Sequence, residues 1–569
     1  MEHALKIELE EKQYRSGRFS LNILQGAEVL EAISQDEFAE DWAQLYQKCP
    51  WATVYQSLDF VQLWYQTYQQ YTPILVVGFE NKKLAGLLPL FRGQNKELSA
   101  AGANQAEYQV WISTTAGNDR FIENALREIR GRFPGHKLQL KYLPEQTPLS
   151  WASDHSWHKN VWVQPVKHPI MRINREVLDT ELRKKNKREK VNRLKRMGEL
   201  RFERITDYSA FTEVFDELAQ QNDFRKGAVY NASYYHNNPI AKKFLLGLFE
   251  RNLLHATVLK VDDEIIASNV GTISGRWVHL QGINTHSPAH AKHSPGILHF
   301  LMLGQLLADE GYEVFDLTPG SDPYKETLAT EHIQSYKFTF QGTHAQNISK
   351  LKFSVAEKLK VLFNRMGINR YQQRSAKNKM LIASEKLKIV KKTKSLSAVL
   401  SSTSIFGEVG AVRSFHLHSN KDLQKNPALH INLNVLKDLL DFEPGGTLLT
   451  KWEFLEDAMK RLEAGQEFYT FNQGGRLLCC MWKQKPVPPG RAGKTETNDG
   501  GAPLELMNLY FHPKGESRIK EFLEGVLEEI NSRGGHTIES AILRSKDKRV
   551  CRALAARGFD HDEEAIKAD

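Results

Sequence analysis

Asp316 and Lys325, close together near the middle of the chain, are the first candidates for catalysis. A carboxylate at position 316 is able to accept a proton from an amine or a hydroxyl group if its pKa is raised. The alternative is that Asp316 caps the turn that follows it. Lys325 is able to neutralise an oxyanion or a phosphate, and Tyr324 to stack on a ligand. The alternatives are a solvated lysine and a tyrosine packed under the turn.

Three histidines, His286, His290 and His293, lie in one loop upstream of this pair. Imidazole titrates near neutral pH, so His290 is a candidate general base, and His286 and His293 are candidates for substrate binding. Their spacing also suits a metal site, but no cysteine or carboxylate joins them in the loop, and we expect no metal. The alternative is that at least two of them are surface histidines without a task.

The same loop ends at Ser294, Pro295 and Gly296, which have the pattern of a helix start. Serine suits the N-cap and proline the first helical position, so we expect Ser294 to cap the free N–H groups of a helix running on through Ile297. The positive end of such a helix suits a phosphate or a diphosphate. Most helix starts of this kind bind nothing, which is the alternative.

A strand, a loop, a helix, a second strand and a glycine turn are the elements that carry these residues. We expect the first strand to end with residues 281–285, the helix to cover 297–311, and the second strand to cover 312–317. This order places Asp316 at the carboxyl end of the second strand.

A recurring unit of helix and hairpin organises the whole chain. The hairpin turns lie at residues 80–83, at Asp262-Asp263 and at Gly474-Gly475. A unit that returns at a long period indicates duplicated domains, and hairpins followed by strand, helix and strand indicate a mixed sheet. We therefore predict an α/β (α+β) fold of tandem units, with mixed, mostly antiparallel sheets flanked by helices. The helix of the second copy is expected at 207–221.

Composition describes an ordinary globular protein of 569 residues, with 41% hydrophobic and 25% charged residues. The sequence holds no apolar run of eighteen residues or more, its first residues are polar, and its four cysteines are scattered. These features favour the cytoplasm. Cys479 and Cys480 lie in an apolar strand and are expected in the core. The net charge of +9 fits an anionic ligand, a nucleic acid or an anionic membrane surface and selects none of them.

Two basic segments suggest where domains meet. Residues 184–196 lie between the first and second copies, and residues 346–402 form a helical linker. The linker either lies on an anionic membrane surface at the inner face of the membrane or packs on a neighbouring domain. We expect a mobile insertion at 486–503. The predicted domains are 1–168, 169–345, the linker 346–402, and 403–569.

Four motifs follow one another in the second copy: LRKKNKREKVNRLKRMGELRFERI, EIIASNVGTISGRWVHLQGIN, HSPGILHFLMLGQLLADEGYEVFDLTPG and PYKETLATEHIQSYKFTF. This segment resembles bacterial GNAT-like acyltransferases associated with cellulose and exopolysaccharide biosynthesis (the CelD/BcsL type), and more distantly the FemAB peptidyltransferases. Residues 1–168 resemble the N-terminal half of the same proteins. Residues 403–569 resemble a degenerate GNAT unit, because only Gly515 remains of the glycine-rich phosphate turn.

The resemblance implies that two parallel strands splay apart, near 278–283 and 314–317, and hold an acyl thioester between them. A backbone N–H polarises the thioester carbonyl, and the acceptor attacks it directly. In this interpretation acyl-CoA is a donor substrate and no cofactor is bound permanently. The implied donor-binding residues are Gln281, Gly282, Ile283, Ser294, Pro295, Gly296, Ile297 and Tyr324; the implied acceptor-binding residues are His286, His293, and Arg225 and Lys226 in a loop after the helix 207–221.

The acyl acceptor implied by the resemblance is an amino or hydroxyl group of a sugar or another cell-envelope precursor. A rival interpretation is an aminoacyl transferase that uses charged tRNA, whose phosphates the basic segment 184–196 contacts. A second rival is a scaffold without turnover in an envelope-biosynthesis complex. Such a scaffold keeps its cellular role when Asp316 and Lys325 are both replaced.

Overall fold

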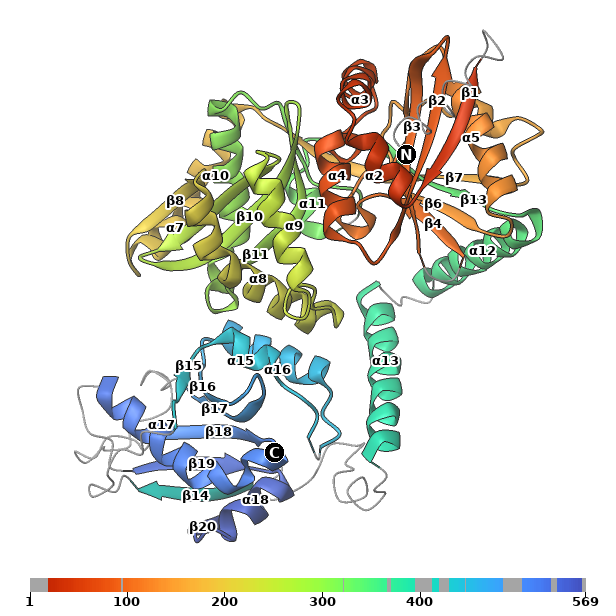
Figure 1. The fold of residues 1–569 in the computed structure, drawn as a ribbon. Helices are drawn as coiled ribbons and strands as arrows, with labels where there is room; N and C mark the ends of the chain where they lie inside the picture. Colours follow the sequence, from red (N-terminus) through yellow and green to blue (C-terminus); the bar gives the residue numbers. More distant parts are fainter. Residues whose placement is uncertain are drawn as a thin grey trace. The chain divides into compact units, whose positions relative to one another are not determined.

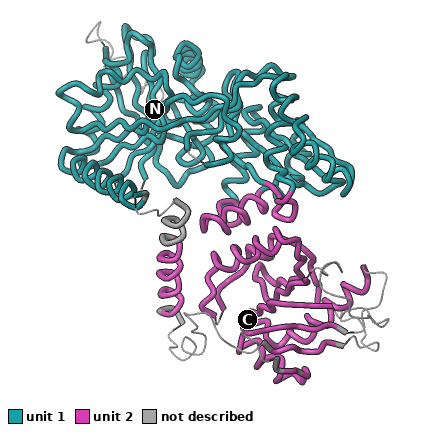
Figure 2. The backbone as a smooth tube through the Cα atoms, turned by 180° about the vertical axis from the view of Figure 1, so that it is seen from behind, with its two compact units in different colours: residues 1–218, 238–285, 293–367 teal, residues 219–237, 286–292, 368–569 magenta. Residues whose placement is uncertain are grey.

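The computed structural model describes residues 19–93, 96–320, 322–365, 370–393, 412–418, 429–445, 447–484, 504–533 and 540–564. The predicted insertion at 486–503 lies outside these residues. The chain forms two compact units, coloured separately in Figure 2. Unit 1 comprises residues 1–218, 238–285 and 293–367, and unit 2 comprises 219–237, 286–292 and 368–569.

Unit 1 is built on a mixed sheet of thirteen described strands with helices on its faces (Figure 1). Twelve strands follow the order β1-β2-β3-β4-β6-β13-β7-β12-β11-β10-β9-β8, and β5 pairs with β3. The strands are β1 (Ser20–Gln25), β2 (Thr72–Glu80), β3 (Lys83–Arg92), β4 (Glu97–Ala100), β5 (Ile112–Ser113), β6 (Lys137–Leu143), β7 (Val161–Arg172), β8 (Leu200–Ile205), β9 (Leu254–Val261), β10 (Glu264–Ser274), β11 (Trp277–His286), β12 (Val314–Asp316) and β13 (Glu331–Phe340).

The described part of unit 1 also contains the following helices. They are α2 (Ala27–Ile33), α3 (Asp36–Lys48), α4 (Leu58–Thr67), α5 (Asn118–Arg132), α6 (Arg175–Arg183), α7 (Lys185–Lys195), the first part of α8 (Tyr208–Tyr230), α9 (Pro239–Glu250), α10 (Pro295–Asp309), α11 (Pro323–Leu328) and α12 (Thr343–Arg365). No helix of the described residues is both long and apolar enough to cross a membrane.

Strand β13 comes late in the chain of unit 1 but pairs with two earlier strands. It lies between β6 and β7 and pairs antiparallel with both, although it follows α11 in the chain. The predicted boundary between residues 168 and 169 falls inside β7. The division of this region into two GNAT-like units stays a prediction, and a single sheet runs through it.

Strands β11 and β12 pair in parallel only over Trp277–His279 and Val314–Asp316, while β11 continues to His286. Gly282 lies beyond the last pair, at a φ of 136°, and a Cβ there would stand 2.0 Å from the carbonyl oxygen of Val270. Only glycine fits this bend. The two strands therefore part after His279 and Asp316, in the region that the resemblance implies.

The far face of this strand pair is apolar and packs on helix α10. Val278 and Phe315 are fully buried in a cluster with Phe300, Leu303 and further side chains of α6 and α10. Because side chains alternate along a strand, burying these residues turns His279 and Asp316 to the opposite face.

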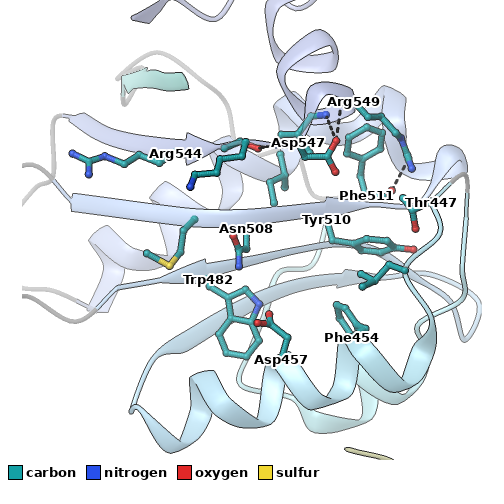
Figure 3. A pocket seen from close by; sticks show the side chains of 16 residues that line it. Thr447, Phe454, Asp457, Trp482, Asn508, Tyr510, Phe511, Arg544, Asp547 and Arg549 are labelled. Atoms are coloured by element: carbon teal, nitrogen blue, oxygen red, sulfur yellow. Dashed lines mark hydrogen bonds between the residues drawn. The ribbon is translucent and has the colours of Figure 1, made fainter. Parts of the chain in front are cut away.

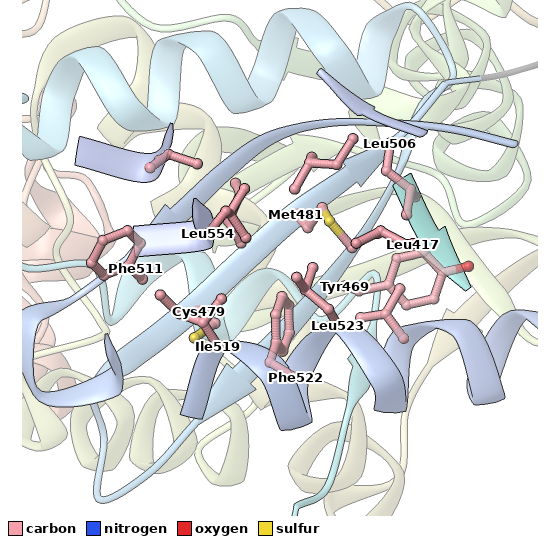
Figure 4. Close-up of a cluster of buried hydrophobic side chains, with 14 of the residues drawn as sticks. Leu417, Tyr469, Cys479, Met481, Leu506, Phe511, Ile519, Phe522, Leu523 and Leu554 are labelled. Atoms are coloured by element: carbon pink, nitrogen blue, oxygen red, sulfur yellow. The ribbon is translucent and has the colours of Figure 1, made fainter. Parts of the chain in front are cut away.

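Unit 2 holds a sheet of seven described strands in the order β15-β16-β17-β18-β19-β14-β20. Its core includes Phe511, Ile519, Leu554 and Cys479 (Figure 4). Cys479 and Cys480 both lie on β17 and are buried, as predicted. The strands are β14 (Val412–His418), β15 (Asn432–Leu433), β16 (Glu467–Asn472), β17 (Leu477–Lys483), β18 (Leu504–Phe511), β19 (Ser540–Ser545) and β20 (His561–Glu564); the helices are α13 (Arg370–Thr393), α15 (Leu436–Leu440), α16 (Lys451–Glu463), α17 (Ile519–Arg533) and α18 (Lys548–Ala555).

Helix α8 is longer than the predicted 207–221, because it continues to Tyr230. Arg225 and Lys226 therefore lie in a helix, and the expectation that they lie in a loop is wrong. The physical reason is an apolar stripe: Phe224 and Ala228 are buried in a core cluster of unit 2. The predicted hairpins are confirmed, and their turns use positive φ angles at Asn81, Asp262 and Gly474 among others.

Candidate functional site

Three neighbouring strands bring two histidines and an aspartate together on one face of the unit 1 sheet. Asp316 on β12 pairs with His279 on β11 and with Ile170 on β7, and His168 stands two residues from Ile170 on the same face. Tyr108 approaches from the segment before β5. All four functional side chains are buried.

The Asp316 carboxylate is the centre of this cluster. Its Oδ2 accepts hydrogen bonds from the Tyr108 hydroxyl at 2.6 Å and from His279 Nδ1 at 2.5 Å. Its Oδ1 accepts from His168 Nε2 at 2.6 Å and from the Thr318 backbone N–H at 2.7 Å. Burial by itself would raise the pKa of Asp316, but His168 and His279 hold it well below its ordinary value.

The raised pKa that a general-base role of Asp316 requires is therefore not found. Asp316 stays ionised and does not serve as the general base, because its oxygens are already occupied by donors. The turn-capping alternative is confirmed by the bond from Thr318. Asp316 thus caps the turn and orients the two imidazoles.

His279 and His168 differ in what their second nitrogens do. An ionised carboxylate only accepts hydrogen bonds, so His279 donates to Asp316 through its Nδ1–H. Nε2 has no hydrogen-bond partner within the described part of the chain. His168 is engaged on both sides, because its Nδ1 lies 3.0 Å from the Ser335 hydroxyl. His279 is therefore the imidazole whose second nitrogen is buried without a hydrogen-bond partner among the described residues.

A cavity of about 530 Å³ opens beside this cluster, within unit 1. Its volume suits a small ligand. Tyr108, His168 and His279 form part of its wall. The remaining lining combines aromatic rings with charges of both signs: Tyr46, Trp51, Trp277, Arg172, Arg276, Glu145 and Glu313 are among its residues.

Two phenols frame the imidazole of His279. The Tyr55 hydroxyl lies 2.7 Å from Thr272 Oγ1, and its ring centroid lies 5.9 Å from that of His279. Burial, followed by the nearby Asp316, raises the pKa of Tyr108, and burial raises that of Tyr55. Both phenols therefore keep their protons at neutral pH.

Lys325 is buried, with 6% of its surface exposed, so the alternative of a solvated lysine is wrong. Its Nζ donates to the Thr318 carbonyl at 3.1 Å and to Thr318 Oγ1 at 2.9 Å. Burial lowers the pKa of Lys325. Thr318 also donates to Asp316, so one residue links the lysine to the aspartate. Tyr324 beside it is half-buried, and its ring stacks on that of Phe300 with the two centroids 6.2 Å apart. This contact agrees with the alternative that Tyr324 packs against the protein.

The start of α10 differs from its prediction. Pro295 occupies the first turn as expected, but Ser294 adopts φ 53° and makes no side-chain cap, so the predicted cap is wrong. Its hydroxyl instead accepts a hydrogen bond from Lys190 Nζ at 2.7 Å. The left-handed backbone turns the serine away from the helix. The basic helix α7 thereby places a cation at the positive end of α10, close to Gly296 and Ile297.

The three loop histidines are less exposed than expected. His290 and His293 lie in a 3₁₀ helix (Pro288–His293) and are buried, so the surface alternative is wrong for these two. Burial, followed by the charge of Arg225, lowers the pKa of His286 to about 4. His286, His290, Arg225 and Lys226 are counted in unit 2, so they are not part of the cluster around Asp316.

Strand β11 contains three of the predicted donor-binding residues, and each has a different environment. Gln281 Nε2 donates to the Asn104 carbonyl at 2.8 Å, Gly282 forms the bend, and Ile283 is fully buried. Their roles toward a donor stay a prediction.

Four residues of this site were missed by sequence reasoning: Tyr108, His168, His279 and Lys190. His279 carried a usable signal, since it stands in the predicted strand beside the strand of Asp316. His168 and Tyr108 carried none, because they lie 148 and 208 residues before Asp316.

Comparison with known proteins adds an independent observation. The model of the acetyltransferase (GNAT) domain family matches residues 182–326. No curated protein matches the sequence. Among solved structures, the chain is similar to the C-terminal domain of a putative lysylphosphatidylglycerol synthetase from Agrobacterium fabrum, at 15% identity over 56% of this chain and 95% of that one, with a TM-score of 0.37.

Two further solved structures have comparable similarity. FemX shares 11% identity over 55% of this chain and 98% of its own, with a TM-score of 0.39. A tandem GNAT protein from the clavulanic acid biosynthesis pathway shares 13% over 57% and 98%, with a TM-score of 0.35. The CelD/BcsL resemblance stays a prediction. The family comparison therefore supports a likeness to the acetyltransferase (GNAT) domain over residues 182–326.

Proposed function

We propose that unit 1 transfers an acyl group from acyl-CoA to the primary amine of a sugar or another envelope precursor. The observation that carries this proposal is the free Nε2 of His279, oriented by an ionised Asp316 where β11 and β12 part. A base held in this way, beside a cavity of about 530 Å³, suits an attacking amine.

The acyl thioester is proposed to lie between the diverging strands, with its diphosphate at the start of α10. Lys190 and the helix dipole support an anion there. The bend at Gly282 leaves backbone groups of β11 unpaired with β12, and one N–H is proposed to polarise the thioester carbonyl.

The reaction itself needs one proton relay. The amine nitrogen attacks the thioester carbon, a C–N bond forms, and the C–S bond breaks as the tetrahedral intermediate collapses. His279 Nε2 takes the proton from the amine and returns it to the departing thiolate. Asp316 stabilises the imidazolium that forms between these two steps.

The lining of the cavity supports a polar acceptor with a flat apolar face. Trp277 offers an aromatic surface, and Arg172, Arg276, Glu145 and Glu313 offer donors and acceptors for hydroxyl groups. An amino sugar has both kinds of surface.

One observation favours a second donor, aminoacyl-tRNA. Helix α7 exposes Lys185, Arg188, Arg193 and Lys195. Binding through such a surface weakens steeply as salt rises, whereas acyl-CoA binding in a gap between strands changes less.

The test combines ligand-induced stabilisation with turnover. Acetyl-CoA, longer acyl-CoAs and free CoA are added during thermal unfolding, and thiol release is followed with D-glucosamine as acceptor. A ligand at about a hundredfold its dissociation constant adds about 2.7 kcal/mol of stability.

Lys190→Ala should weaken binding, and Lys195→Ala on the same helix serves as the matched control. If none of the thioesters stabilises the protein, the acyl-CoA proposal is wrong, and charged tRNA is tested next.

We also propose that α12 lies on an anionic membrane surface. Leu351, Val355, Leu359 and Leu362 are exposed on it, and Lys352, Lys358 and Lys360 are exposed among them. Apolar groups and lysines together suit anionic lipid, with about 1 kcal/mol per lysine near the surface. The chain should sediment with phosphatidylglycerol vesicles more than with phosphatidylcholine vesicles, and Leu359→Glu should reduce this. Equal sedimentation with both lipids would contradict the proposal.

A further inference from the structure

A second cavity, of about 540 Å³, lies entirely within unit 2 and is separate from the site described above. Figure 3 shows Trp482, Tyr510 and Phe454 on one side of it, and Arg544 of β19 and Asp547, which follows β19, on the other. The proposed acyl transfer does not use this cavity.

The cavity forms where two parallel strands part. Strand β18 pairs with β19 only as far as Met507 and Arg544, and β18 then continues to Phe511. Asn508 follows the last pair at a φ of 52°, which bends the strand away. The space is therefore a product of the backbone and does not depend on one side-chain rotamer.

Three aromatic residues make a rigid apolar wall. Phe454 stacks on Phe442 with ring centroids 4.1 Å apart, and the Tyr510 hydroxyl donates to the Glu443 carbonyl at 2.9 Å. The Arg461 guanidinium lies 5.7 Å from the Trp482 ring centroid. Because each ring is held by a partner, the wall is organised before any ligand arrives.

Most charged groups around the cavity already have partners. Asp457 binds Arg461 at 2.6 Å, and Asp547 accepts from the N–H of Arg549 at the start of α18. Arg549 itself donates to the Phe511 carbonyl at 2.7 Å. These groups build the cavity and leave little charge for a ligand.

Two cations remain for a ligand. Lys546 is exposed and makes no ion pair within the described part of the chain, and Arg544 has only an exposed contact with Glu505 at 3.3 Å. The lining of the cavity therefore combines two exposed cations with an aromatic wall.

In the part of unit 2 that the structure describes, the turn at Gly515 offers no prepared place for a diphosphate. The N–H of Gly515 donates to the His512 carbonyl at 2.8 Å, and a Cβ on Gly515 would stand 2.7 Å from the Leu478 carbonyl oxygen. Arg518 is paired with Glu521 at 2.6 Å. The loop that a nucleotide diphosphate would need is thus closed on the protein itself.

We propose that this cavity binds a small organic anion with a flat apolar body, such as an aromatic carboxylate. The ring lies against Trp482, Tyr510 and Phe454, and the carboxylate faces Lys546 and Arg544. The site makes unit 2 a ligand-binding module and not only a degenerate copy of unit 1.

Isothermal titration of the full chain tests this with three probes: naphthalene-2-carboxylate, its neutral carboxamide, and acetate, which lacks the ring. The carboxylate should bind roughly fivefold more tightly than the carboxamide, the upper range for an exposed ion pair, and acetate should show no binding. The double variant Lys546→Ala/Arg544→Ala should abolish this preference. Lys548→Ala, a neighbouring cation outside the lining, should keep it.

Three results would overturn the proposal. One is the absence of binding by the naphthalene carboxylate, and another is equal affinity for carboxylate and carboxamide in the unaltered chain. The third is displacement of the carboxylate by acetyl-CoA at stoichiometric concentration, which would make the cavity a coenzyme site.

Discussion

His279 and His168 bind the same carboxylate but have different roles. His168 bonds on both nitrogens and holds β7 to its neighbours, whereas His279 bonds on one, and its Nε2 has no partner among the described residues. We therefore expect His168, with both nitrogens bonded, to stabilise the fold. We expect His279, with one nitrogen unbonded, to transfer the proton.

Replacing each histidine by glutamine should separate these roles. His279→Gln should lower kcat by about a hundredfold or more, since it removes the base, with a small change in melting temperature. His168→Gln should chiefly lower the melting temperature. Both are measured on purified variants with acetyl-CoA and D-glucosamine. If His168→Gln lost the activity and His279→Gln kept it, the assignment of the base would be wrong.

A third histidine, His299 on α10, is expected to make unit 1 sensitive to acid. Its Nε2 lies 3.1 Å from Thr257 Oγ1, and burial, with His255 nearby, lowers its pKa to about 3. The unfolded chain protonates this residue near pH 6.5. Between those values the unfolded state binds more protons, so the free energy of unfolding must fall as pH falls.

Urea unfolding at several pH values between 7 and 4 measures this effect. His299 should contribute a slope of about 1.4 kcal/mol per pH unit, and His299→Gln, which does not titrate, should remove it. His344→Gln replaces an exposed histidine and is the control. An unchanged slope in His299→Gln would show that other groups cause the acid sensitivity.

At the scale of the element, the bend in β11 decides where the site lies. Pairing with β12 ends at His279 and Asp316, and the bend at Gly282 moves the strand away beyond them. Helix α10 then returns the chain so that β12 lies parallel to β11. The reactive side chains consequently stand at the point where the sheet opens.

Gly282→Ala tests the bend. A Cβ there meets the Val270 carbonyl, so the change should cost more than about 2 kcal/mol of stability and weaken acyl-CoA binding. Gly275→Ala is the matched control, because Gly275 has φ 57° with nothing within 4 Å of an added Cβ. It should cost about 1 kcal/mol from its left-handed backbone alone. Equal, small losses in both variants would mean that the strand accommodates the added methyl.

At the scale of the molecule, the two units do not follow the order of the chain. Residues 219–237 are counted in unit 2, where Phe224 and Ala228 pack in a core cluster with Leu439 and Leu455. The end of α8 is thus part of the C-terminal core, although the family match at 182–326 includes it.

A shortened chain that ends at residue 367 should therefore associate with itself in solution. Without residues 368–569, the apolar side chains of Phe224 and Ala228 lose their cover, and exposed patches of this kind promote association. Size-exclusion chromatography should show self-association, and Phe224→Ser in the shortened chain should reduce it. A monodisperse shortened chain would show that α8 does not need unit 2.

Local pattern determined much of the fold in advance. The hairpin turns at Asp262-Asp263 and Gly474-Gly475, the helix that starts at Pro295 and the mixed α/β class all follow from residues close together in sequence. The same pattern placed Asp316 at the end of its strand. It also identified Lys325, but not its burial.

Only the tertiary structure decided what Asp316 does. Its partners His168 and Tyr108 come from strands and loops that precede it by 148 and 208 residues. His168, together with His279, lowers the pKa of Asp316, whereas a general-base role required a raised pKa. The sequence likewise did not predict the cavity in unit 2. The physical reason is that local propensity sets the elements, whereas burial and charge depend on which distant elements pack together.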